Sequence, residues 1–150
     1  MRAEVVRAGH PPPSFLVQRM AAPGVEMLVG VVHDAQFGPV VACGAGGTAV
    51  ELVHDVAVRI TPLTARAAGE MVRSLATFPL LDGYRGAPRA DVGALEDVLL
   101  RISALVEAHP QVAELECNPA VVTPAGATVV DIRARVRAVP PTAPSPSVAG

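Results

Sequence analysis

The sequence predicts an α+β fold, a mostly antiparallel sheet with two helices on one face. Three observations lead to this class. Short runs rich in Val, Ile and Leu, separated by Gly and Pro, fill the N-terminal part of the chain and are typical of strands. Two later stretches carry apolar residues at helical spacing, and an alternating strand pair follows them. Strands, helices and a closing hairpin grouped in this way pack as layers around one core.

Composition limits the possible functions. The chain has 150 residues, enough for one domain, and 51% of them are hydrophobic. No run approaches the roughly 18 apolar residues of a membrane span, and prolines and charges stand where a signal peptide needs an apolar block. These features predict a cytoplasmic protein with no membrane partner. A net charge of −2 offers no basic surface for nucleic acid.

The basic residues are all arginines, since the chain contains no lysine. This excludes a Walker A lysine, a Schiff-base lysine and a Ser-Lys dyad. Cys43 and Cys117 lie far apart in sequence without zinc-site spacing, so buried, reduced thiols are expected. No residue is identified as catalytic.

Three segments are expected along the chain. Residues 1–13 form a flexible leader, because their proline run favours an extended, solvated backbone. Residues 14–138 form the folded domain. Residues 139–150 form a Pro-rich disordered tail, because prolines among small residues cannot build a core.

Apolar runs in the first part of the chain predict strands at residues 15–20, 25–32, 40–43 and 48–60. Gly and Pro residues between the first two runs predict a turn. Glu26 lies at the start of the second run, where a solvated edge carboxylate is the ordinary expectation.

A glycine-rich loop, Gly44-Ala45-Gly46-Gly47, follows the third run. Such a loop can bring backbone N–H groups close to an anion, although plain tight turns are at least as common. Arg59, near the end of the fourth run, is placed where it could reach a phosphate; a surface ion pair is the alternative.

Two helices are predicted in the middle of the chain. Thr64 is a good N-cap for a helix over residues 65–76, and Asp91 caps a stronger one that extends to about Ala108. Between them, residues 80–86 form a loop in which two glycines flank the pair Tyr84-Arg85.

The closing stretch, residues 112–136, predicts a hairpin about the turn at residues 123–126, where Pro and Gly suit the reversal. Side chains two apart share a face, so polar residues of the two strands meet on one face and apolar residues on the other. Both faces agree on one register, which a slip by one residue would destroy. The expected pairs are Asn118 with Asp131, Glu116 with Arg133, Glu114 with Arg135, Cys117 with Ile132, and Leu115 with Ala134.

The oxygen-only cluster of Glu116, Asn118 and Asp131 suits Mg²⁺, which takes one or two carboxylates and shares itself with phosphates. On spacing alone, a solvated cross-strand ladder of carboxylates and arginines is the commoner outcome. Pro119 cannot donate a ladder hydrogen bond, and it therefore predicts an edge or a bulge beside this cluster.

Several motifs in a fixed order resemble the ATP-grasp domain of NDP-forming acyl-CoA synthetases, the ADP-forming acetate–CoA ligases. The resemblance covers roughly residues 15–138. It rests on Glu26 to Val31, Asp34 to Val41, Gly44 to Gly47 with Glu51, Arg59 to Leu63, Leu81 to Gly86, Glu114 to Pro119, and Val130-Asp131. The hairpin is also similar to that of succinyl-CoA synthetase β subunits.

The resemblance implies the reaction acyl-CoA + ADP + phosphate ⇌ acid + CoA + ATP, with Mg²⁺ and ATP or ADP as cofactors. It favours the metal site over the ladder, because the family's Mg²⁺ ligands correspond to Asn118 and Asp131, with Glu116 in the preceding acidic position. Nucleotide and phosphate contacts are expected from Gly46, Gly47, Glu51 and Arg59.

The chain departs from the family in one large respect. The lysine-bearing half of the ATP-grasp domain, the CoA-binding domains and the phosphorylated histidine have no counterparts in it. We therefore expect a C-terminal, metal-carrying half that needs a complementary ATP-grasp half and a CoA-binding subunit or domain as partners. The alternative is a non-catalytic regulatory module, related to those fused to Gcn5-related protein acetyltransferases.

Overall fold

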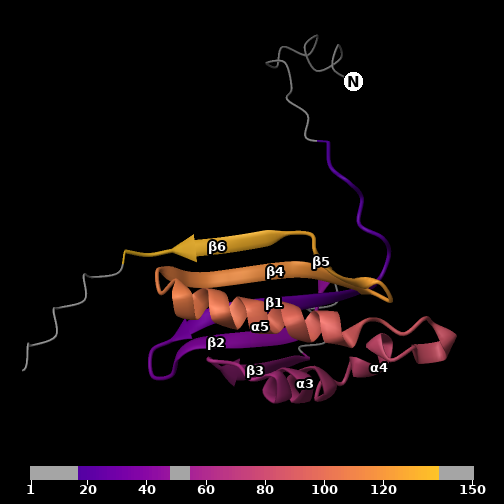
Figure 1. The fold of residues 1–150 in the computed structure, drawn as a ribbon, viewed down its shortest axis with the longest axis horizontal. Coiled ribbons are helices and arrows are strands. Elements are labelled where there is room, and N and C mark those ends of the chain that lie inside the picture. The colour runs from indigo at the N-terminus through magenta and orange to yellow at the C-terminus, as the bar shows by residue number, and fades with distance from the viewer. Residues whose placement is uncertain (1–16, 48–54, 139–150) are drawn as a thin grey trace, which may run out of the picture.

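The computed structural model of the chain describes residues 17–47 and 55–138 (Figure 1). The described elements fall into three groups along the chain. Strands β1 (Val25–Asp34), β2 (Gly38–Ala45) and β3 (Val56–Ile60) come first; helices α3 (Ala65–Arg73), α4 (Phe78–Leu81) and α5 (Val92–Ala108), with the 3₁₀ turn η2 (Tyr84–Gly86), come next; strands β4 (Val112–Thr123), β5 (Gly126–Val129) and β6 (Ile132–Val136) come last.

The strands form one six-stranded sheet in which every pairing is antiparallel. The order is β3-β2-β1-β4-β5, and β6 also pairs with β4. The long strand β4 therefore lies beside β1 on one edge, and beside β5 and then β6 on the other. The predicted antiparallel α+β fold is confirmed.

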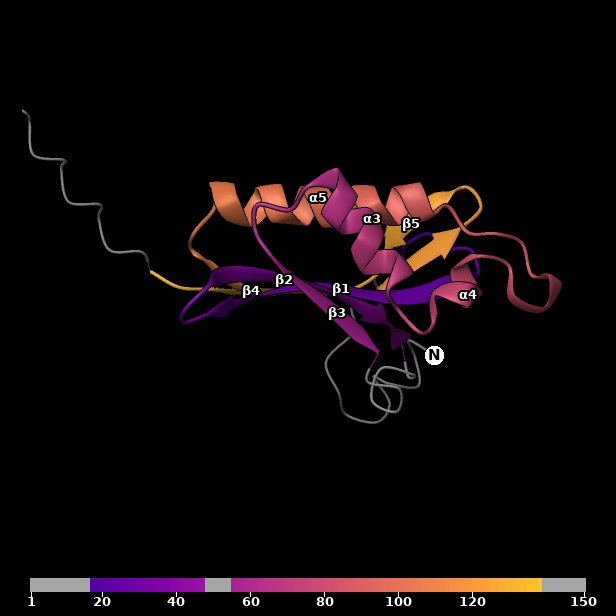
Figure 2. The same ribbon diagram turned by 90° about the horizontal axis from the view of Figure 1, so that it is seen from below.

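Helices α3 and α5 lie together on one side of the sheet (Figure 2). The core fills the space between these layers: Met27 and Val29 of β1 and Leu95 and Leu99 of α5 are fully buried in one apolar cluster. Such burial supplies most of the free energy that holds the helices on the sheet. The opposite side of the sheet, which these helices leave free, is called the open face below.

The predicted helix caps are present. The Thr64 hydroxyl accepts a 3.2 Å hydrogen bond from the Ala67 N–H, and the Asp91 carboxylate accepts one of 2.9 Å from the Ala94 N–H. The first helix ends at Arg73, three residues earlier than predicted, because the Ser74 N–H closes the final turn on the Glu70 carbonyl. The predicted loop at residues 80–86 instead contains the end of α4 and the turn η2.

The predicted strand at residues 15–20 is wrong over its described part. Residues 17–20 belong to no strand, and Val17 is 92% and Met20 87% exposed. An apolar run needs a paired neighbour and a buried face to become a strand, and residues 17–20 have neither. Residues 15–16 and 48–54, which complete two predicted strands, lie outside the described part.

The closing hairpin has the predicted register. Glu114 pairs with Arg135, and Glu116 with Arg133. The Asn118 N–H donates to the Asp131 carbonyl at 3.2 Å, which places these two residues opposite one another. The second strand is not continuous, however. It divides into β5 and β6 at residues 130–131, and β4 changes partner at the same level.

A bulge explains this division. On β4, Ala120 pairs with Met27 and Cys117 with Val29, so that Asn118 and Pro119 together oppose the single residue Leu28. The bulge falls at the proline where the sequence predicts one, since Pro119 has no N–H to give to the ladder. The extra residue bends β4, and the strand that pairs with it therefore divides into β5 and β6.

Candidate nucleotide and metal site

Part of the open face has a floor of small residues with charged ones beside it. One row across the sheet runs from Ala42 through Gly30 and Glu116 to Arg133. Gly30 cannot carry a side chain, because a Cβ there would lie 2.9 Å from the Leu115 carbonyl oxygen. A hollow of about 450 Å³ lies over this part of β1, β4 and β6.

Asn118 joins the glycine-rich loop to the hairpin. Its side-chain oxygen Oδ1 accepts a 2.9 Å hydrogen bond from the Gly47 N–H, across 71 positions of sequence. Its Nδ2 donates to Glu116 Oε1 at 3.3 Å. The bulge therefore aims this amide so that it holds the loop with one atom and a carboxylate with the other.

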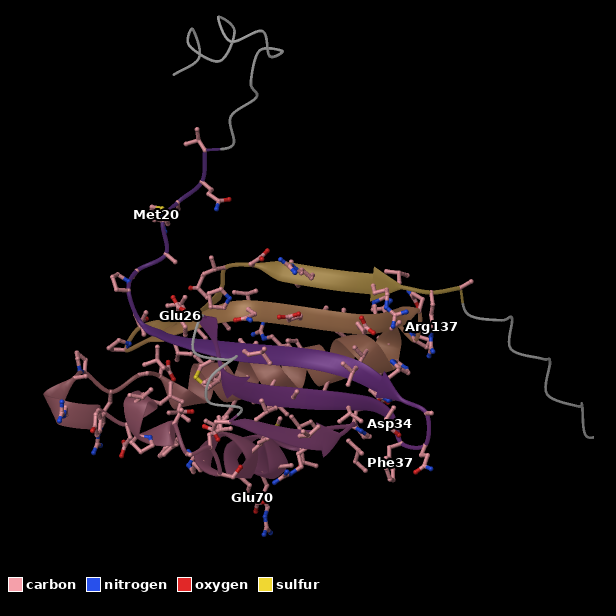
Figure 3. The ribbon with its side chains drawn as sticks, turned by 180° about the vertical axis from the view of Figure 1, so that it is seen from behind. Met20, Glu26, Asp34, Phe37, Glu70 and Arg137 are labelled. Carbon is pink, nitrogen blue, oxygen red and sulfur yellow. The ribbon has the colours of Figure 1, made fainter. Side chains whose placement is uncertain are left out.

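The glycine-rich loop lies directly against the start of β1. The Gly46 N–H donates to the Glu26 carbonyl at 2.9 Å. A Cβ on Gly47 would lie only 1.7 Å from Glu26 Oε2, and the φ of Gly47, +64°, also disfavours any larger residue. Figure 3 shows Glu26 at this end of β1. Both glycine amides are thus already engaged, and they fix the loop in place.

Glu26 belongs to this corner, although its position in the sequence predicts only a solvated carboxylate without a role. Its exposed carboxylate lies beside Gly47, and Asn118 contacts the same loop residue. Its neighbours in the sequence do not indicate this position, because only the fold shows that the loop after β2 returns to the start of β1. Glu26, Glu116 and Asn118 therefore surround one end of the open face.

The oxygen donors fit a hard cation shared with a ligand. Glu116 and Asp131 are exposed carboxylates, and Asn118 adds an amide oxygen. Within residues 17–47 and 55–138, no three His, Cys, Asp or Glu side chains gather closely enough to hold a metal by themselves. Mg²⁺ commonly takes one or two carboxylates and completes its shell with water and phosphate oxygens, so this donor set suits it.

Arg59 lies apart from that corner. It pairs with Val41, which is buried beneath the helices, so its side chain leaves the sheet on the helix side. Its Nη1 donates to the Val58 carbonyl at 2.8 Å. Hydrogen bonding and the charge of Arg66 lower the pKa of Glu70 on α3, and the charge of Arg59 lowers it further. The structure brings Arg59 towards Glu70, and not towards Glu116 or Asp131.

Two further expectations concern Glu51 and the two cysteines. Glu51 lies outside the described residues. Both cysteines are buried and free, and burial, followed by the charge of Asp55, raises the pKa of Cys43 to about 12. A buried thiol that remains protonated is not a nucleophile.

Comparison with known proteins identifies the family to which this fold belongs. A family profile for the ATP-grasp domain matches residues 1–136. The chain belongs to the ATP-grasp family. It is 47% identical over 118 residues to acetate–CoA ligase (ADP-forming) I of Archaeoglobus fulgidus, a match that covers 79% of this chain and 17% of that protein.

A second relative and a solved structure are also similar to this chain. The acetate–CoA ligase (ADP-forming) I subunit beta of Pyrococcus furiosus is 36% identical, with 79% of this chain and 51% of that subunit covered. The dinucleotide-forming acetyl-coenzyme A synthetase 1 of Ca. Korarchaeum cryptofilum, solved with coenzyme A and Mg-AMPPCP, superimposes with a TM-score of 0.76 and 39% identity. That match covers 78% of this chain and 55% of the solved one. The chain thus spans between about a sixth and about half of these relatives.

Proposed function

We propose that this chain is the nucleotide- and Mg²⁺-binding part of an ADP-forming acyl-CoA synthetase. The observation that carries the proposal is the hydrogen bond from the Gly47 N–H to Asn118 Oδ1. It unites the glycine-rich loop and the acidic hairpin, two motifs 71 residues apart, at one end of an open sheet face. A purely structural hairpin ladder has no need of that connection.

The metal ligands in this proposal are Glu116, Asn118 and Asp131. When bound, Mg²⁺ would supply neutralisation of the negative charge on the nucleotide phosphates. The protein's part is positional. The Nδ2 contact with Glu116 and the Oδ1 contact with Gly47 fix the plane of the Asn118 amide before any ligand arrives.

Phosphate contacts are proposed at Gly46 and Gly47, whose lack of side chains allows close approach to the backbone. Because both amides already have partners, a phosphate would have to compete with the Glu26 carbonyl or with Asn118 for them. Roles for Glu51 and Arg59 remain predictions. Arg59 would have to release the Val58 carbonyl in order to contact a phosphate.

Complete turnover requires more than this chain in our proposal. Phosphoryl transfer depends on holding the reacting groups in line and away from water, and one open sheet face holds a nucleotide from one side only. The chain spans 51% of the Pyrococcus subunit beta and contains no lysine. A complementary ATP-grasp half and a CoA-binding subunit or domain are the proposed partners.

Calorimetric titration of the chain with Mg-AMPPCP tests the site. We expect binding that requires Mg²⁺ and that Asp131→Asn weakens about tenfold or more, because one of two carboxylates is lost. Asp97→Asn is the matched control: it removes the same charge from an exposed pair with Arg101 on α5, on the far side of the sheet. If both variants weakened binding equally, the effect would be explained by net charge alone, and the proposed site would be contradicted.

A second experiment separates the ligase from the regulatory alternative. The 118 matched residues of the Archaeoglobus ligase are replaced by those of this chain, which keeps every other part of that enzyme. ADP-forming turnover by the chimera, lost with Asp131→Asn and retained with Asp97→Asn, is the expected result. A folded chimera that binds Mg-AMPPCP without turnover would favour the non-catalytic module.

A further inference from the structure

The segment between α4 and α5 carries an exposed aromatic–arginine pair that the proposed site does not use. Residues 82–90, here called the Tyr84 loop, extend away from the sheet and from its open face (Figures 1 and 2). Tyr84 is 54% exposed. The Arg85 guanidinium carbon lies over its ring, 5.6 Å from the ring centroid. This is a cation–π arrangement, and Arg85 is itself an exposed residue.

The Tyr84 loop is held firmly although it is exposed. The Gly86 N–H donates to the Gly83 carbonyl and the Ala87 N–H to the Tyr84 carbonyl, each at 3.2 Å. At its base, the Ala90 N–H donates to the Leu81 carbonyl at 2.8 Å. Binding through a preorganised loop loses little conformational entropy, which favours affinity.

Arg85 occupies a backbone conformation that suits glycine better. Its φ is +54°, and it is the one non-glycine residue with positive φ in the described ranges 17–47 and 55–138. The left-handed region costs an arginine conformational energy that a glycine would avoid. Glycine would suit a loop that only connects two helices, so the arginine at this position motivates the hypothesis of a role for its side chain.

Charge indicates what the pair recognises. Arg89 is already paired with Asp82, at 3.4 Å. Among the described residues, by contrast, no carboxylate lies within ion-pair distance of Arg85. Stacking on Tyr84 holds the guanidinium plane while its donors stay available, and a carboxylate matches them with two parallel hydrogen bonds.

The shape of the loop favours a protein as the ligand. Small molecules bind in concave sites that bury most of their surface, whereas this pair is at a projecting tip. Tyr and Arg are, with Trp, the residue types enriched among those that dominate protein–protein binding energy. Leu80 of α4, four residues before Tyr84 in sequence, is 44% exposed and adds apolar surface to this part of the chain.

We propose that the Tyr84 loop docks onto a protein surface that presents an Asp or Glu carboxylate beside a shallow apolar recess. That surface belongs to the part of the ligase that this chain does not span, and the assignment of partner therefore rests on the proposed function. Tyr84 fills the recess, and Arg85 pairs with the carboxylate.

Hydrogen exchange at the amides of residues 84–87 and 89 tests the docking, in the isolated 150-residue chain and in the Archaeoglobus chimera described above. We expect exchange about tenfold slower or more in the chimera, because a docked loop opens less often. Arg85→Gly should abolish the difference while leaving the melting temperature of the isolated chain equal or higher. Arg89→Gln is the matched control, since it alters the neighbouring arginine, and it should keep the protection.

Three results would overturn the docking proposal. The first is equal exchange of the loop in the isolated chain and in the chimera. The second is protection that persists in both Tyr84→Ala and Arg85→Gly. The third is protection of the loop in the isolated chain by Mg-AMPPCP, which would indicate a small anion as its ligand. Loss of chimera turnover with the loop still protected would reject the proposed function and leave the docking in place.

Discussion

Asn118 Oδ1 lies 2.9 Å from the backbone nitrogen of Gly47 and accepts its hydrogen bond. This contact links a bulge in β4 to the loop that follows β2, although β1 separates the two strands in the sheet. The hydrogen bond lies at the end of β1 that carries Glu26. The geometry of the proposed site therefore depends on one amide side chain.

Removing that amide should loosen the loop. We expect Asn118→Ala to lower the free energy of unfolding by about 1 kcal/mol, the usual net contribution of such a hydrogen bond, and the melting temperature by about 4 °C. Thermal unfolding followed by circular dichroism measures this change. An unchanged melting temperature would mean that the Gly46 contact with Glu26 holds the loop without Asn118.

Asn118→Asp separates the structural role of the amide from metal binding. An aspartate can still accept from the Gly47 N–H, but it cannot donate to Glu116, and it brings a second negative charge to within about 3.3 Å of that carboxylate. Like charges this close destabilise one another. The variant should be less stable than the natural chain in EDTA and should recover on addition of Mg²⁺. Recovery with NaCl alone would indicate screening and not a metal site.

The carboxylate of Asp55 should make the free energy of unfolding decrease at acid pH. Its carboxylate accepts hydrogen bonds from the N–H groups of Ala76 and Thr77, at 3.0 and 2.8 Å, and one from the Thr77 hydroxyl. Burial raises the pKa of Asp55, but the hydrogen bonds from Thr77 and Ala76 outweigh this, and the pKa lies below its ordinary value. A lowered folded-state pKa stabilises the fold above the unfolded value of about 3.9, and the contribution disappears as pH falls through the folded value.

Asp55→Ala should therefore cost about 1 kcal/mol at pH 7, a figure kept small because the carboxylate is largely solvated. The difference from the natural chain should shrink below about pH 4 as the carboxyl protonates. Urea unfolding at a series of pH values measures it. A gap that is constant from neutral pH to below pH 4 would mean that the methylene and not the charge matters.

The hairpin could be predicted from sequence because two independent patterns agree on it. Acidic residues at 114 and 116 face arginines at 135 and 133, and Leu115 and Cys117 face apolar partners on the other side. A side-chain period of two leaves one register that satisfies both faces. The helix caps Thr64 and Asp91 were predictable for a similar reason, since capping is a local interaction.

The corner around Gly47 could not be predicted in this way. The contact between Gly47 and Asn118 joins residues 71 positions apart, and the place of Glu26 follows only from the order β2-β1-β4. The face taken by Arg59 depends on its pairing with Val41, which periodicity in the strand alone does not fix. Residues 17–20 show the opposite limit: an apolar run without a neighbouring strand does not become one.

The isolated chain should show no ADP-forming acetate–CoA ligase turnover in a coupled assay with acetyl-CoA, ADP and phosphate. One sheet face cannot exclude water or align the in-line transfer by itself. The Archaeoglobus chimera, assayed in parallel, shows that the reagents and the Mg²⁺ supply are adequate. Turnover by the isolated chain that Asp131→Asn abolishes would contradict the need for a complementary half.

Arg59 covers part of the free edge of the sheet at β3. The Asp55 carbonyl accepts a hydrogen bond from the Ala45 N–H, and the Thr61 N–H donates one to the Pro39 carbonyl. Odd-numbered residues of this strand therefore direct their backbone groups towards β2, and the even-numbered Val58 directs its groups away from it. Arg59 Nη1 donates to that outward Val58 carbonyl at 2.8 Å. A charged side chain folded over a free strand edge hinders pairing with another chain.

Arg59→Thr should therefore promote self-association. Threonine favours strands and carries no charge, and it would leave an edge whose open-face side chains, Val56, Val58 and Ile60, are all β-branched and exposed. Sedimentation over a concentration series should show a monomer for the natural chain and a growing average mass for the variant. Arg59→Lys keeps the charge and should remain monomeric. A monomeric Arg59→Thr variant would show that the short length of β3 is enough to prevent pairing, and the edge-protecting role of Arg59 would then be rejected.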